Sequence, residues 1–168
     1  MRILGRRRGN VLLESAMLIP VIVLLLVGMG QIAKITYTYY NLRKAIYSVG
    51  SYLSAQQGTN FCDPTDANVQ QAISFGLTGT TDNTQPTLIT GLTPDMITVS
   101  PQVVDSVTGA IGPCDCSVTG CDLAAGGKAP GFILVSIPNG YMITPRIPFL
   151  PLLAIPLKPQ VKVPYGGT

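Results

Sequence analysis

The feature that most constrains this 168-residue chain is an uninterrupted apolar run near its N-terminus. Between Glu14 and Lys34, 19 consecutive residues carry no charged side chain. A helix rises about 1.5 Å per residue, so roughly 20 apolar residues cross the hydrocarbon core of a bilayer. The run therefore predicts one transmembrane span over about residues 15–33, within a longer helix over residues 10–57.

The distribution of charge around this run predicts its orientation. Four of the eleven basic residues lie in the first nine positions, at Arg2 and Arg6–Arg8. Such clusters stay on the cytoplasmic side of a membrane, and three basic residues shortly after the run weaken the asymmetry without reversing it. We therefore expect residues 1–9 to be a basic leader, and residues 58–168 to be a small exported domain.

The helix is expected to continue beyond the membrane with one apolar face. Apolar residues recur there at helical spacing, at Ile35, Leu42, Ile46, Val49 and Leu53. This stripe has two interpretations, which are packing onto the chain's own C-terminal domain and packing between subunits. The sequence leaves both open, since different faces of one helix can serve both.

The remainder of the chain predicts an α+β fold, in which the long N-terminal helix precedes a small antiparallel β-sheet domain. Residues 58–130 are rich in Thr, Gly, Asp, Asn and Pro, which is typical of short elements joined by turns. We expect a short helix over residues 66–75, with Thr65 as its N-cap. Strands are expected within residues 87–89, 97–100, 103–107, 132–137 and 160–163.

Residues 141–158 are apolar but are interrupted by Pro145, Pro148, Pro151 and Pro156. Proline lacks a backbone donor, so this segment predicts neither a second membrane span nor a central strand. It is expected to be a proline-punctuated loop or short helix packed on the core. The alternative is an exposed apolar surface for a partner subunit.

Gly9, Asn10 and Glu14 form the sharpest motif. Cleavage after Gly9 removes all four leader arginines and creates an α-amino group at Asn10, with Glu14 four residues further on. Among packed apolar helices, an ammonium or a carboxylate alone is costly, whereas a pair of them between neighbouring subunits neutralises both and sets the axial register. The alternative is an uncleaved signal anchor, with Glu14 incidental.

Residues 8–26, RGNVLLESAMLIPVIVLLL, resemble the start of TadE-like minor pseudopilins of the Tad (tight adherence) pilus, a branch of the type IV pilin-like superfamily. That family shares a basic leader, a Gly, a Val-Glu-like pair, an Ala and a Pro before a leucine-rich run. Residues 37–45 resemble its post-membrane helix. The chain departs from the pattern at Leu13 and over residues 47–51.

The resemblance implies a structural component of pilus assembly that a prepilin peptidase trims after Gly9. The implied partners are other pilins, minor pseudopilins and the pilus assembly platform. The implied location is the bacterial inner (cytoplasmic) membrane, crossed once with the C-terminal domain exported, and an extracellular pilus after assembly. The alternatives are a pilin of another type IV-like filament, and an unprocessed signal-anchored envelope domain that binds a protein partner.

Four cysteines, Cys62, Cys114, Cys116 and Cys121, lie in the expected exported domain. An even number in an oxidising compartment predicts two disulfides, with three connectivities. A Cys114–Cys116 bridge is disfavoured because its ring is very small. A bridge from Cys62 to Cys114 or Cys116 would tie the end of the long helix to the sheet domain. A metal site built from the four thiolates is the disfavoured alternative.

The composition argues against catalysis and cofactor binding. The chain has no His for acid–base chemistry, and it contains no phosphate-binding loop or dinucleotide fingerprint. No basic patch is interleaved with aromatic residues, so nucleic-acid binding is not expected. We therefore expect no enzyme, no metal site and no cofactor.

Overall fold

The computed structural model describes residues 6–82, 84–116, 120–147 and 150–167. It contains helices α1 (Arg6–Ala55) and α2 (Ala67–Thr78), and the short 3₁₀ helices η1 (Pro94–Met96) and η2 (Leu123–Ala125). Its strands are β1 (Thr98–Val104), β2 (Ile111–Pro113), β3 (Phe132–Ser136), β4 (Tyr141–Ile143), β5 (Arg146–Ile147), β6 (Leu150–Pro151), β7 (Ile155–Leu157) and β8 (Gln160–Pro164).

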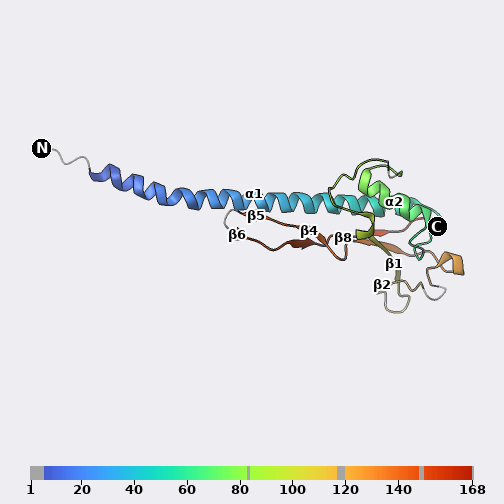
Figure 1. The fold of residues 1–168 in the computed structure, drawn as a ribbon. Helices are drawn as coiled ribbons and strands as arrows, with labels where there is room; N and C mark the ends of the chain where they lie inside the picture. The colour runs from blue at the N-terminus through green and yellow to red at the C-terminus, as the bar shows by residue number, and fades with distance from the viewer. Residues whose placement is uncertain (1–5, 83, 117–119, 148–149, 168) are drawn as a thin grey trace.

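These elements confirm the α+β fold class: a long N-terminal helix extends from a small antiparallel sheet domain (Figure 1). Four strands form the main sheet in the order β2–β1–β3–β8, and every neighbouring pair is antiparallel. In β3 the buried residues Ile133 and Val135 alternate with half-buried ones, so one face of the sheet is directed to the core. The sheet thereby covers one side of α1.

Helix α1 is the axis of the domain as well as its N-terminal extension. The stripe that the sequence predicts is buried, with Leu42, Ile46, Val49 and Leu53 fully inaccessible and Ile35 half-buried. These residues pack within the chain, between the sheet and α2. The stripe therefore follows the first of the two interpretations, which is packing onto the chain's own C-terminal domain. Each such side chain contributes about 1.5–3 kcal/mol relative to an exposed one.

Two glycines allow this close packing on α1. A Cβ at Gly50 would lie 2.8 Å from Val163 Cγ2 of β8, which places the sheet almost against the helix backbone. A Cβ at Gly76 of α2 would lie 2.9 Å from the Ala45 carbonyl oxygen and would overlap Val49 Cγ2. Strand β8 and helix α2 therefore both lie so close to α1 that a side chain at Gly50 or Gly76 would not fit.

Replacing Gly76 tests this packing. Gly76→Val forces its side chain against the backbone of α1, so we expect the free energy of unfolding to fall by about 3 kcal/mol. Denaturant titration of the full chain in detergent micelles measures this loss. Gly112→Val is the matched control, because a Cβ at Gly112 meets nothing within 4 Å. Equal stabilities of the two variants would contradict the close approach.

The expected N-cap of the second helix is wrong by one residue. The Thr65 hydroxyl donates to Asp63 Oδ1 at 2.6 Å, so it is engaged outside the helix. Asp66 caps α2 instead, and its Oδ1 accepts from the backbone of Asn68 at 2.9 Å and of Val69 at 3.4 Å. The helix also continues three residues beyond the expected end, to Thr78, where Gly79 adopts a left-handed conformation.

The expected strands agree with the structure in part. The two runs over residues 97–100 and 103–107 meet in one strand, β1, which covers only Thr98–Val104 and continues through Pro101, just outside the pairing with β2. Ile97 ends η1 instead, and residues 105–107 lie at the turn that follows β1. Residues 87–89 form no strand. The Leu88 amide donates instead to the Leu77 carbonyl at the end of α2, at 2.8 Å. This segment is therefore hydrogen-bonded to the end of a helix and not to a neighbouring strand.

The expectation of a loop or short helix over residues 141–158 is wrong for the residues that the structure describes there, while Pro148 lies outside the described residues. The segment folds back as a hairpin in two short ladders, β4 with β7 and β5 with β6. A ladder of two strands uses only alternate amides, so prolines at the remaining positions are tolerated. The hairpin extends alongside α1 toward its N-terminal part (Figure 1).

Candidate functional site

The N-terminal part of α1 carries an exposed apolar surface. Within the described residues, one helix is long and apolar enough to cross a membrane; its best window has a mean hydropathy of 2.4 and no buried residues. The helix continues through Pro20 without interruption. Its apolar side chains from Leu13 to Ile32 are mostly half exposed or more. Most of this part therefore has no cover from its own domain, and the exception is Gln31, which accepts a hydrogen bond from the Arg146 amide of β5.

Glu14 is the one carboxylate on this surface. It is exposed, and its nearest charged neighbours in the sequence are Arg8 and Lys34. The backbone at Gly9 and Asn10 belongs to α1, whereas their side-chain surroundings lie outside the described residues. An isolated carboxylate among apolar side chains is unfavourable in a lipid or protein interior unless an opposite charge meets it. In such an interior, Glu14 would therefore need an opposite charge beside it.

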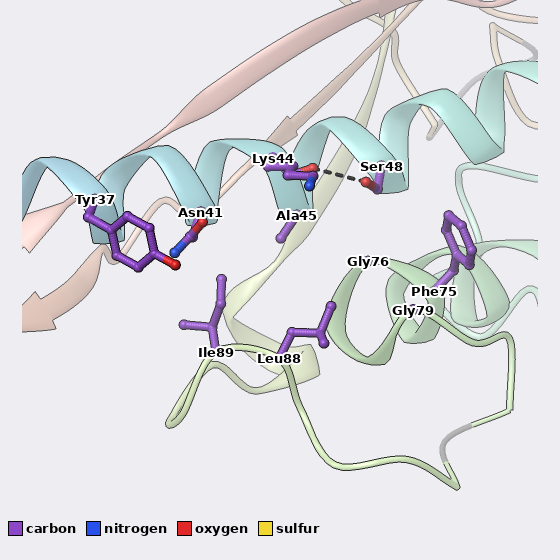
Figure 2. Close-up of a pocket in the computed structure, with 10 residues that line it drawn as sticks. All are labelled: Tyr37, Asn41, Lys44, Ala45, Ser48, Phe75, Gly76, Gly79, Leu88 and Ile89. Carbon is purple, nitrogen blue, oxygen red and sulfur yellow. Dashed lines mark hydrogen bonds between the residues drawn. The ribbon is translucent and has the colours of Figure 1, made fainter.

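A groove opens between α1, α2 and the segment that follows α2 (Figure 2). Its volume is about 290 Å³. Figure 2 shows Tyr37 and Asn41 of α1 directed toward Leu88 and Ile89, with Phe75 of α2 at the other end. Its lining combines apolar side chains with the polar groups of Tyr37, Asn41, Lys44 and Ser48, which suits a side chain or a short segment of another protein.

A second hollow, of about 460 Å³, lies between α1 and β8. Most of its lining consists of two tyrosines and three basic residues. These are Tyr40, Tyr47, Arg43, Lys44 and Lys162, and Gln160 and Val161 complete the lining. No acidic residue is among its lining residues. Its chemistry suits an acidic or anionic group of a partner.

Two disulfides close the domain at the end of α1. Cys62 pairs with Cys116 across a Cα–Cα distance of 5.5 Å, and Cys114 pairs with Cys121 at 5.9 Å. The disfavoured Cys114–Cys116 bridge does not form. The Cys62–Cys116 bridge ties the segment after α1 to the loop after β2, and Asn60 Nδ2 adds a hydrogen bond to Asp122 Oδ1 at 3.0 Å.

The C-terminal segment is also joined to the end of α1. The Tyr165 hydroxyl donates to the Gln56 carbonyl at 2.7 Å, and its ring meets Phe61 edge-on with centroids 5.1 Å apart. Burial raises the pKa of the Tyr165 phenol above its ordinary value of 10.0. This group therefore contributes its full stabilisation below pH 10, and the contribution is lost as the pH rises through the higher, folded-state pKa.

The described residues present no assembled metal site. No three His, Cys, Asp or Glu side chains gather in that part of the chain in a way that suits a metal ion. All four cysteines are oxidised, so none supplies a thiolate. The functional chemistry that this structure offers is that of surfaces: the apolar helix with Glu14, and the two hollows beside α1.

Comparison with known proteins adds no relative, since no family model, curated protein or solved structure matches this chain. Function is therefore argued from the arrangement of the residues themselves. The sequence identified the apolar surface and Glu14. It missed both hollows, because their walls come from segments as far apart as Tyr37 and Ile89, or Tyr40 and Lys162.

Proposed function

We propose that this protein is a minor pseudopilin of the TadE-like class, a structural component of pilus assembly and not an enzyme. It inserts into the bacterial inner membrane by the N-terminal part of α1. A prepilin peptidase removes residues 1–9, and the mature chain joins other pilins and minor pseudopilins through helix packing. Its partners are these subunits and the assembly platform of a Tad-type pilus.

One observation carries the proposal: a single helix of 50 residues serves two purposes. Its C-terminal half is the core of the α+β domain, and its N-terminal half is bare and apolar. An anchor that only tethers a domain needs about 20 apolar residues followed by a linker. A rigid helix continuous with the core instead holds the domain at a fixed position relative to the membrane or to neighbouring helices.

The position of Glu14 gives this helix a means of assembly. Cleavage after Gly9 leaves the new α-amino group of Asn10 about 6 Å along the helix axis from Glu14, at a rise of 1.5 Å per residue. A neighbouring subunit shifted axially by about that distance brings its amine to this carboxylate. The pair neutralises two charges that are costly separately, so it favours one register among many apolar alternatives.

A signal-anchored envelope domain that binds a protein partner is the second candidate. The two hollows beside α1 favour it, because both are open and combine apolar walls with polar or basic groups. In that function the N-terminal helix is never processed, and Glu14 has no role in register. Cleavage at Gly9 therefore separates the two candidates.

The test is the intact mass and the N-terminal peptide of the protein from native membranes, with and without the prepilin peptidase. We expect a mature chain that begins at Asn10 only when the peptidase is present. Gly9→Leu should block processing, and Gly5→Leu is the matched control, since it alters a glycine in the same leader away from the cleavage site. A chain that retains residues 1–9 in both strains would contradict processing, and the signal-anchored envelope domain would be the remaining candidate.

A further inference from the structure

The β5–β6 end of the hairpin lies beside the membrane-spanning part of α1. The Arg146 backbone amide donates to Oε1 of Gln31 at 3.3 Å, and β5 contacts α1. Gln31 belongs to the last turn of the span expected over residues 15–33. Lys34, the first charged residue after the span, follows only three residues later, about 4.5 Å along the helix. The hairpin therefore reaches the level at which α1 enters the bilayer.

The hairpin exposes apolar side chains close to this boundary, where Met142 lines the same hollow as Lys34. Leu153 is 90% exposed, Met142 is 61% exposed, and Leu152 and Ile155 are about two-fifths exposed. The end of the expected span exposes apolar side chains as well, since Met29 and Ile32 are each 65% exposed. So much apolar surface is unfavourable in water, so it indicates a contact that this chain alone does not supply.

The charges at this level suit lipid headgroups. Lys34 and Arg146 are both exposed. All seven aspartates lie within residues 63–122, away from the hairpin sequence. Basic side chains beside apolar ones are the composition of a membrane interface, where the cations meet phosphates and the apolar groups enter the acyl boundary.

The backbone of the hairpin is also suited to this environment. Unpaired amides are costly near hydrocarbon, and strand edges normally expose them. Pro145, Pro151 and Pro156 carry no amide hydrogen, so three of these donors are absent. The edges of this hairpin therefore carry fewer unpaired donors than strand edges without proline would.

From these observations we infer that the described part of the hairpin, residues 141–147 and 150–157, is a second membrane contact, which inserts exposed apolar side chains such as Leu153 and Met142 into the headgroup region of the exported leaflet beside α1. The inference rests on the membrane anchorage included in the proposed function, but not on processing at Gly9. The two contacts together hold the domain against the bilayer in one orientation.

The chain contains no tryptophan, so a single introduced tryptophan reports its own surroundings. The full-length protein is reconstituted in vesicles of phosphatidylethanolamine and phosphatidylglycerol, doped with phosphatidylcholines brominated at shallow or deep acyl positions. Leu153→Trp places the reporter on the hairpin. Val107→Trp is the matched control, because Val107 is 91% exposed at the turn between β1 and β2. Met29→Trp reports the span.

We expect Leu153→Trp to emit at shorter wavelength than Val107→Trp and to be quenched several-fold more strongly by shallow bromines. Met29→Trp should be quenched best by deep bromines. Met142→Trp serves as a second hairpin reporter if the Leu153 variant fails to fold, and circular dichroism establishes folding in each case.

Three outcomes would overturn the inference. If Leu153→Trp behaves like Val107→Trp while Met29→Trp is quenched, the hairpin is in water and the anchorage stands. If Leu153→Trp emission shifts only as the protein-to-lipid ratio rises, a second copy covers the hairpin instead of lipid. If Met29→Trp is not quenched, α1 does not span the bilayer, and the membrane part of the proposed function fails as well.

Discussion

Glu14→Gln is expected to abolish incorporation of the protein into filaments while leaving its amount in the membrane unchanged. The substitution keeps the size of the side chain and removes its charge, so the α-amino group of a neighbouring subunit loses its partner. An uncompensated buried charge costs about 3–5 kcal/mol, and each 1.4 kcal/mol is about a tenfold change in an equilibrium constant. We therefore expect at least about a hundredfold loss, measured by quantitative blotting of sheared pili against the membrane fraction.

Two further variants make this test specific. Glu14→Asp retains the charge on a shorter side chain and should restore part of the incorporation. Met17→Leu is the control one turn away, since it alters the same exposed apolar surface without any charge. Wild-type incorporation of Glu14→Gln would show that Glu14 does not set the register, and the assembly mechanism would have to be abandoned.

Removing the Cys62–Cys116 disulfide is expected to destabilise the domain about twice as much as removing Cys114–Cys121. The first bridge spans 54 residues and the second spans 7. A disulfide restricts the unfolded chain more when the loop that it closes is longer, which corresponds to about 4 kcal/mol for the first and about 2 kcal/mol for the second. The paired variants are Cys62→Ala with Cys116→Ala, and Cys114→Ala with Cys121→Ala.

Each pair removes both cysteines, so no free thiol remains to exchange with the other bridge. Denaturant titration of the full chain in micelles gives the free energies of unfolding. Hydrogen exchange adds a local measurement, since the first pair should expose amides near the end of α1 and the second should not. Equal losses of stability would contradict the loop-length argument and would indicate that local packing around the bridges dominates.

Much of the fold could be predicted from local patterns. The stripe of Leu42, Ile46, Val49 and Leu53 repeats with the period of a helix, and a face of that kind must be buried. Strands β3 and β8 alternate with the period of a sheet. These predictions succeeded because the signal in each case lies within a few neighbouring residues.

The failures share one cause, which is competition between local preferences. Thr65 and Asp66 both favour an N-cap, and only the prior engagement of Thr65 by Asp63 assigns the cap to Asp66. Over residues 141–158, prolines argue against a sheet, yet a two-stranded ladder against α1 needs few of the missing amides. In each case the outcome depends on a neighbour that the local pattern does not contain.

The sequence by itself determined the long helix, its apolar N-terminal half, the isolated Glu14 and the α+β class, because charge, hydropathy and period are local properties. Only the tertiary structure decided which cysteines pair, how closely Gly50 and Gly76 let their neighbours approach α1, and that the hairpin returns to Gln31. Arg146 and Gln31 are 115 residues apart. Contacts at such separations depend on how the whole chain closes its loops, and no local pattern of residues encodes that closure.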